Sequence, residues 1–237
     1  MRDRLKDLEF HLPPPVHAVA VRRLGMVQDP YTAENDELGA IFIHVPKTAG
    51  SSITEAFFKR KPRHIPLSRY YATDAGRYDR YFKFGFVREP HSRLYSAYNY
   101  LTRPGVLQTS PDFRWATEHL TRFDSFEAFV LALEDRRFRR IATSYVHFRP
   151  QHHWLRVPGV TANGLDFLGR FETLEADAQA LGERFAVRGA LPHKRKAETG
   201  AGAALPFSRR MSVIVADLYA QDFKLFGYDP AVAGRSG

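Results

Sequence analysis

The sequence contains no cysteine among its 237 residues. This absence excludes disulfide bonds, thiol catalysis and zinc sites built on thiolates, and it suits a reducing compartment. No apolar run approaches the ~18 residues of a membrane span. The first residues, MRDRLKDLEF, lack the apolar core of a signal peptide. We therefore expect a soluble, cytoplasmic protein without a transmembrane segment.

Two further absences concern nucleotides and metals. The ATP-binding pattern G-x-x-x-x-G-K-[ST] does not occur, and no Gly-Lys-Ser/Thr is found anywhere in the chain. No metal-ligand constellation is evident either, because the adjacent His152 and His153 would diverge on a regular element rather than chelate. We therefore expect no metal site and no ordinary ATP site.

The composition is that of a globular protein with a basic surface. Hydrophobic residues make up 44% of the chain and aromatic residues 14%, which is enough for one full core. The formal net charge is +9. Such a surface favours anionic partners: nucleotides, nucleic acid, acidic glycans or membrane headgroups.

The hydrophobic pattern predicts an arm followed by one domain. Residues 1–38 are irregular and Pro-punctuated, and we interpret them as an N-terminal arm packed on a single domain of residues 39–237. Apolar runs predict strands at 41–45, 63–67, 82–87 and 165–171. Helices are expected from capping boxes at 52–55 and 124–127, after Pro90, over 174–185 and near the C-terminus, with Gly227 as the last cap. This alternation predicts a three-layer α/β fold around a mainly parallel sheet.

Two loops carry most of the chemical information, and each is expected at the carboxyl end of a strand, where α/β sheets bind ligands. The first, residues 46–52 (PKTAGSS), combines Lys47, a close backbone approach at Gly50 and a helix N-terminus, a combination that suits a small tetrahedral anion. An ordinary strand-to-helix turn accounts for this loop about as well. The second loop supplies Arg88, whose fork of donors fits a phosphate, and Ser96 in the helix that follows.

Together the segments VPKTAGSSI and FKFGFVREPHSRLYSAYNYL resemble the two nucleotide signatures of PAPS-dependent carbohydrate sulfotransferases. PAPS is 3′-phosphoadenosine 5′-phosphosulfate. The resemblance is to the branch containing heparan sulfate 2-O-sulfotransferase and its bacterial relatives, which has a P-loop nucleotide-kinase-like fold. It is strongest over residues 41–101, weaker at 147–151, 167–172 and 222–228, and does not cover 1–38. Glu89 departs from the Asn or Asp common in the family. The missing cysteine pairs point to a bacterial-type enzyme.

The resemblance implies roles for individual residues. The first signature would bind the 5′-phosphosulfate through Lys47, Thr48, Ala49, Gly50, Ser51 and Ser52. The second would bind the 3′-phosphate through Arg88 and Ser96. The expected reaction is an in-line sulfuryl transfer from PAPS to a hydroxyl, with 3′-phosphoadenosine 5′-phosphate (PAP) as product and Lys47 stabilising the departing oxygen.

A histidine is the expected general base for the acceptor hydroxyl. His44 lies inside the first strand, where a packed structural role is the better interpretation, and His91 could face nucleotide or solvent. The family carries its base between the two signatures, so the resemblance favours His64. His147 and Gln151 belong to a segment like the family's H-x-x-P-Q stretch, and either line the acceptor cleft or hold a loop in place.

The acceptor implied by the resemblance is a glycan or glycolipid, and the basic surface suits a negatively charged one. Three other functions remain open. A P-loop kinase or NTPase would need the missing Gly-Lys-Ser/Thr. A nucleic-acid-binding module would account for the charge but not for the two loops, and no such signature is present. A PAPS-binding protein without catalysis would retain nucleotide affinity without turnover. The basic segment 193–204 is expected either to close over the nucleotide or to be plain surface.

Overall fold

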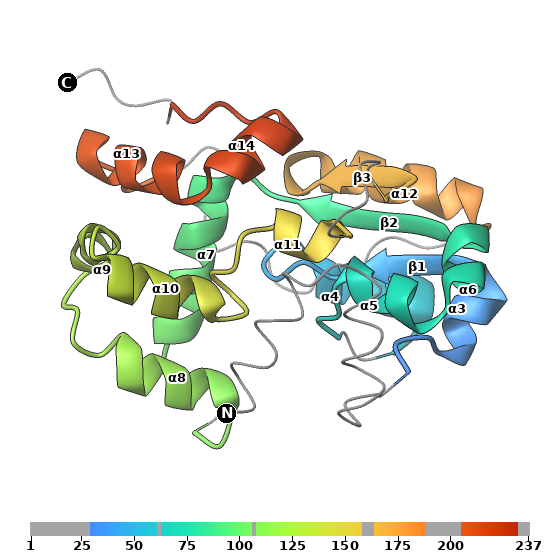
Figure 1. Ribbon diagram of the computed structural model, residues 1–237, viewed down its shortest axis with the longest axis horizontal. Helices are drawn as coiled ribbons and strands as arrows, with labels where there is room; N and C mark the ends of the chain where they lie inside the picture. Colours follow the sequence, from blue (N-terminus) through green and yellow to red (C-terminus); the bar gives the residue numbers. More distant parts are fainter. Residues whose placement is uncertain (1–28, 61–62, 106–107, 158–163, 188–204, 232–237) are drawn as a thin grey trace. The chain divides into compact units, whose positions relative to one another are not determined.

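The computed structural model describes residues 29–60, 63–105, 108–157, 164–187 and 205–231 (Figure 1). These residues belong to two compact units, one formed by residues 1–87 and 151–198 and the other by 88–150 and 199–237. The elements of the first unit are α3 (Ala33–Leu38), β1 (Ala40–Ile43), α4 (Gly50–Phe58), α5 (Leu67–Thr73), α6 (Ala75–Arg80), β2 (Phe82–Val87), α11 (His152–Leu155), β3 (Phe167–Arg170), η1 (Phe171–Thr173) and α12 (Leu174–Arg184). Those of the second are α7 (Pro90–Thr102), α8 (Pro111–His119), α9 (Phe126–Ala132), α10 (Arg136–Ser144), α13 (Arg209–Leu218) and α14 (Ala220–Phe226).

The first unit contains a parallel sheet in the order β1-β2-β3, visible in Figure 1 with β2 between its neighbours. All four residues of β1 are buried, as the apolar run predicts for a strand covered on both faces. Phe42 of β1 pairs with Phe84 of β2, which in turn pairs with Phe167 of β3. The predicted parallel sheet is confirmed.

Helices cover both faces of this sheet. On one face, Phe84 packs in a cluster with Phe57 of α4 and Leu181 of α12. The neighbouring residue on β2, Gly85, faces the opposite way because side chains alternate along a strand. A Cβ atom placed on Gly85 would lie 2.8 Å from a methyl carbon of Leu155, so α11 covers the second face. The unit is therefore three-layered, as predicted.

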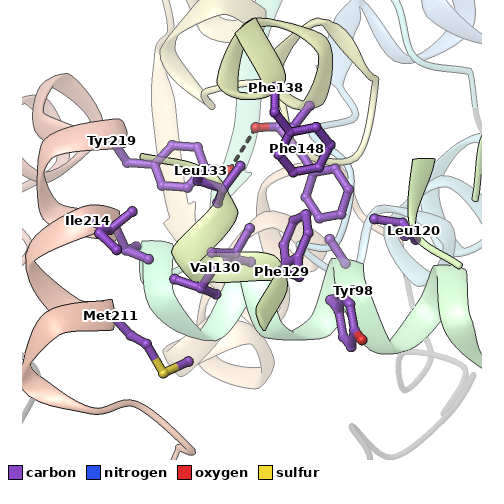
Figure 2. Close-up of a cluster of buried hydrophobic side chains, with 14 of the residues drawn as sticks. Tyr98, Leu120, Phe129, Val130, Leu133, Phe138, Phe148, Met211, Ile214 and Tyr219 are labelled. Carbon is purple, nitrogen blue, oxygen red and sulfur yellow. Dashed lines mark hydrogen bonds between the residues drawn. The ribbon is translucent and has the colours of Figure 1, made fainter. Parts of the chain in front are cut away.

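The second unit is a helical assembly around its own core. Phe129 and Val130 of α9 are fully buried among side chains of α7, α10, α13 and α14. Figure 2 shows this cluster, in which the Tyr219 hydroxyl donates a hydrogen bond of 2.7 Å to the backbone carbonyl of Phe148. The hydrogen bond pairs the buried hydroxyl of Tyr219 with the buried carbonyl of Phe148. Neither group would find a partner among apolar side chains.

The described part of the N-terminal segment packs against the first unit. The hydroxyl of Tyr31 donates to the carbonyls of Tyr70 and Asp74 at 3.1 and 3.0 Å, and Asn35 of α3 donates to the carbonyl of Ala40 at 2.7 Å. Residues 1–28 and the basic segment 193–204 lie outside the described residues. The interpretation of 39–237 as a single domain remains a prediction. Within the described ranges, no helix has both the length and the apolar character needed to cross a bilayer.

Three local predictions are wrong. Residues 63–66 form no strand, and helix α5 begins at Leu67; Pro66 has no N–H to donate to a sheet ladder, which disfavours a strand there. Helix α4 begins at Gly50 without a side-chain cap, two residues before the predicted box at Ser52. The N-cap of α9 is Ser125 rather than Asp124, with its hydroxyl accepting from the N–H of Ala128 at 3.1 Å.

Candidate functional site

The loop between β1 and α4 has a strained backbone. Lys47 and Ala49 adopt φ values of 72° and 63°, in the left-handed region that residues other than glycine rarely occupy. Each such residue costs about 1–3 kcal/mol and persists only where its surroundings enforce it, often at functional sites. Alternating left-handed residues turn successive N–H groups toward one side of the chain, and such concave backbone nests bind anions.

The first turn of α4 follows this loop and offers further backbone N–H groups. The N-cap residue is Ala49, which has no side-chain oxygen, so the orphan N–H groups of the first turn are not capped by that side chain. The backbone there passes extremely close to His44: a Cβ atom on Gly50 would lie 1.7 Å from Cδ2 of the imidazole ring. Only glycine fits at position 50, which accounts for the residue that the sequence singled out.

The side chains of the loop divide into structural and accessible ones. Thr48 is fully buried, and its hydroxyl donates a hydrogen bond of 2.9 Å to the carbonyl of Val45. Ser52 is buried, whereas Ser51 is exposed and Lys47 is partly exposed. The hydroxyl of Thr48 thus holds the loop in shape, and Lys47 and Ser51 are the side chains that reach solvent.

His64 lies beside the same loop within the first unit. Its side chain is exposed, and its Nδ1 atom is 3.1 Å from the carbonyl oxygen of His44. The ring centroids of His64 and His44 are 4.3 Å apart, and the indole of Trp154 lies 6.0 Å from His64. The structure thus brings together the predicted base and the predicted phosphosulfate loop, which the sequence separates by more than ten residues.

Arg88 is the first residue after β2 and belongs to the second unit. It is only 4% exposed, and its Nε donates a hydrogen bond of 2.8 Å to the hydroxyl of Ser92. Ser96 is half-buried one helical turn beyond Ser92 on α7. Because Ser92 accepts the hydrogen bond from Nε, it helps to orient the guanidinium of Arg88.

Glu89 caps helix α7. Its carboxylate accepts hydrogen bonds from the N–H groups of His91 and Ser92 at 2.9 and 2.7 Å and contacts Nδ1 of His91 at 2.7 Å. Burial alone would raise the pKa of Glu89, but the hydrogen bonds from His91 and Ser92 outweigh it and lower the pKa. Despite the departure from the family's Asn or Asp, Glu89 therefore still supplies a side-chain cap.

Arg93 is structural. It is 1% exposed, and its two terminal nitrogens donate to the carbonyls of His147 and Arg149 at 3.1 and 2.6 Å. Arg93 and Ser96 are three residues apart on α7, so they occupy neighbouring positions of one helical face. In the structure Arg93 turns into the second unit and satisfies the backbone of the segment that leads to Pro150.

His147 also lies in the second unit and is 8% exposed. Its Nε2 is 3.3 Å from the Asp112 carboxylate, which also accepts hydrogen bonds from Tyr100 at 2.8 Å and from Tyr145. Burial opposes ionisation of Asp112, but its contacts with His147, Tyr145 and Tyr100 outweigh burial and hold its pKa well below the ordinary value. Of the two interpretations of His147, this geometry favours the loop-holding one.

The remaining predicted residue, Gln151, is fully buried and belongs to the first unit. The first unit thus holds residues 47–52, His64 and Gln151, and the second holds Arg88, Ser96 and His147. Sequence reasoning missed the orienting role of Ser92, for which the only available signal was a hydroxyl four residues after a predicted phosphate-binding arginine. Among the described residues, no group of three or more His, Asp or Glu side chains could hold a metal ion.

Comparisons with known proteins agree with the two motifs. The family model described as the sulfotransferase family matches residues 31–229. Carbohydrate sulfotransferase 14 of Mus musculus is 31% identical over 166 residues, which cover 64% of this chain and 43% of that protein. The aligned region therefore spans less than half the length of this relative. No solved structure matches the chain.

Proposed function

Since the chain belongs to the sulfotransferase family, we propose that it transfers a sulfuryl group from PAPS to a hydroxyl of a carbohydrate-type acceptor. The observation that carries the proposal is the loop before α4, where two non-glycine residues are held at positive φ beside an N-terminus without a side-chain cap. Strain of this kind, next to an exposed serine and a lysine, is expected of an anion-binding loop.

The residues of the loop fit a phosphosulfate. When bound, PAPS supplies the sulfuryl group and leaves as PAP. Lys47 supplies a positive charge for the oxygen that departs with the nucleotide, and the N–H groups of the first turn of α4 add donors aimed at the same region. Gly50 lets the start of α4 lie directly against the His44 ring, which a side chain at this position would displace.

Arg88 and Ser96 are proposed to bind the 3′-phosphate. The hydrogen bond from Nε of Arg88 to Ser92 supports this role, because it fixes the orientation of a guanidinium whose fork of donors suits a phosphate. A 3′-phosphate distinguishes PAPS from AMP and ATP, so Arg88 is the proposed basis of nucleotide specificity.

His64 is proposed to accept the proton of the acceptor hydroxyl. As the new oxygen–sulfur bond forms and the bond to the nucleotide breaks, the hydroxyl proton passes to Nε2 of His64 and the electron pair of the broken bond leaves with PAP. The exposure of His64 and its contact with His44 next to the loop support this assignment.

An anionic glycan or glycolipid is the proposed acceptor. The positively charged surface of α10 supports the proposal that this acceptor carries negative charge. Arg139 pairs with Asp217 at 2.6 Å, and the neighbouring Arg210 of α13 pairs with Glu134 at 2.6 Å. Three more arginines of α10 are exposed and have no carboxylate partner among the described residues: Arg136, Arg137 and Arg140. Such unneutralised guanidinium groups attract and steer negatively charged ligands.

The test of nucleotide specificity is calorimetric titration with PAP, AMP and ATP in the absence of Mg²⁺. We expect PAP to bind at least about tenfold more tightly than AMP, because the 3′-phosphate adds charge-assisted hydrogen bonds of about 1.5–3 kcal/mol each. Arg88→Ala should remove this preference, whereas Arg114→Ala, which removes an exposed arginine of α8, should retain it. Equal affinities for PAP and AMP in the unaltered protein would overturn the proposal.

The charge of the acceptor is tested with a triple variant of α10 in which Arg136, Arg137 and Arg140 become Gln. At low salt we expect the KM for an anionic glycan to rise roughly tenfold, at ~0.5 kcal/mol per charge, with the KM for PAPS unchanged. The matched control replaces three exposed cations on other helices: Arg80, Arg114 and Lys224. Equal effects of the two triple variants would assign the attraction to net charge and refute a role of α10.

A further inference from the structure

We propose that His44 is a positioning residue that couples the anion-binding loop to the base. Its backbone carbonyl sets the tautomer of His64, and its imidazole ring holds His64 at a set distance from the first turn of α4. The inference rests on the proposed function, in which Lys47 and His64 act on the same transfer. The sequence alone suggested that His44 is only a packed residue of the first strand.

The contact with the carbonyl determines which nitrogen of His64 can act as the base. The Nδ1 atom of His64 is 3.1 Å from the carbonyl oxygen of His44. A carbonyl oxygen only accepts hydrogen bonds, so Nδ1 must carry the proton of the neutral ring. The lone pair then lies on Nε2, which is the nitrogen able to take the hydroxyl proton. The backbone at His44 thus prepares His64 in the tautomer that the reaction requires.

The ring of His44 contacts both His64 and the first turn of α4. Its centroid is 4.3 Å from that of His64, and its Cδ2 and Nε2 atoms lie 1.7 and 2.2 Å from the position a Cβ atom would take on Gly50. His44 is 6% exposed, and its ring also stacks on Phe42 of β1 at 6.0 Å with an interplanar angle of 16°. One buried ring therefore separates the base from the start of α4.

Through these contacts the position of His64, an exposed loop residue, depends on His44 at the end of the buried strand β1. Residues 63–66, which carry His64, belong to no helix or strand. Catalytic groups need to be held within about 0.5 Å of the productive geometry, which elements of the scaffold achieve better than loops. His44 follows β1 directly, so its contacts with His64 limit the movement of His64 relative to the sheet.

The spacing role is tested with Gly50→Ala, His44→Ala and the double variant. The methyl group of Gly50→Ala overlaps the His44 ring, so this variant should lose PAP affinity and melt at a lower temperature. Removing the ring makes room for the methyl group, so the double variant should recover both properties relative to Gly50→Ala. His44→Ala should bind PAP within about threefold of the unaltered protein but show a kcat reduced about 10- to 100-fold, as expected for a base displaced by about 1 Å.

The tautomer is tested by ¹⁵N NMR of the histidine rings, with the His64 signals assigned by their loss in His64→Gln. We expect Nδ1 to be protonated and Nε2 unprotonated in the neutral unaltered protein. In His44→Ala we expect a mixture of both tautomers, because His64 is no longer held by the ring and can move away from the backbone carbonyl, which this variant retains. A protonated Nε2 in the unaltered protein would overturn the carbonyl's role. A double variant no more stable than Gly50→Ala would overturn the ring's role.

These outcomes are separable from failure of the proposed function. The melting temperatures and the tautomer are measured without nucleotide, and both depend only on the contacts of His44. If the unaltered protein does not prefer PAP over AMP and ATP, that result counts against the sulfotransferase assignment, whatever the His44 variants show. A normal kcat in His44→Ala, with PAP affinity retained, would show that His44 does not position the base.

Discussion

Replacing Arg93 with methionine is expected to destabilise the helical unit without removing a ligand contact. Methionine fills most of the space of the arginine stem but has no donors. The guanidinium is 1% exposed, and its hydrogen bonds to the carbonyls of His147 and Arg149 measure 3.1 and 2.6 Å. The variant would leave both carbonyls without these donors in a buried setting, which costs stability directly.

The magnitude follows from the two bonds. A hydrogen bond to a charged group contributes about 1.5–3 kcal/mol, so the loss of two predicts a decrease in unfolding free energy of about 3–6 kcal/mol. With a urea m-value of about 1–3 kcal/mol/M, the midpoint should fall by roughly 2 M. The control, Arg114→Met on the exposed surface of α8, should change the unfolding free energy by less than about 0.5 kcal/mol.

The chain allows this measurement to be confined to one unit. It contains two tryptophans, of which Trp115 lies in the second unit and Trp154 in the first. In a Trp154→Phe background, fluorescence during urea unfolding reports Trp115 and therefore the helical unit alone. An Arg93→Met midpoint equal to that of the background, together with a loss of PAP affinity, would refute the structural role and identify Arg93 as a ligand contact.

Two other predictions concern neighbouring residues of the second unit. Because the folded pKa of Asp112 lies below its unfolded value of about 4, the ionised carboxylate stabilises the fold above pH 4, and this contribution is lost as the pH falls toward the folded pKa. In urea titrations, Asp112→Asn should therefore be less stable than the unaltered protein at pH 6, and the difference in unfolding free energy between the two should be smaller at pH 3. A difference that does not change with pH would contradict the pKa shift. Ser92→Ala should weaken PAP binding about 3- to 10-fold by releasing Arg88, with AMP binding unchanged, since a single hydrogen bond contributes about 1 kcal/mol; equal losses for PAP and AMP in calorimetry would contradict an effect through Arg88.

The sequence was most informative where the signal is local and contiguous. The apolar run before Lys47 and the Phe-rich run before Arg88 predicted two strands of a parallel sheet, because a short, uninterrupted apolar run in an α/β pattern is typical of a strand buried on both faces. The structure pairs these two strands directly. Gly50 was predicted to allow a close backbone approach, and the structure places the His44 ring against it; its role in anion binding stays a prediction. The family resemblance carried by these two loops is confirmed by the family model over residues 31–229.

The sequence was least informative where tertiary contacts decide. A histidine inside an apolar run gives no sign that its ring contacts Gly50 and His64, because those contacts depend on where α4 and residues 63–66 return to the sheet. Arg93 and Arg88 are equally basic in the sequence, yet Arg93 donates to two backbone carbonyls while Arg88 bonds to a serine. Residue type alone cannot separate a buried structural arginine such as Arg93 from one proposed to bind a ligand, such as Arg88.

The most direct test of the central claim is the transfer of ³⁵S-labelled sulfuryl from PAPS to desulfated and partly sulfated anionic glycans, measured alongside PAP release. We predict labelled glycan and PAP in equal amounts, a large loss of turnover in Lys47→Ala and in His64→Ala, and retained PAP binding in His64→Ala. Tight, 3′-phosphate-dependent binding with no label transferred to any hydroxyl acceptor would contradict the account and leave a nucleotide-binding protein without catalysis.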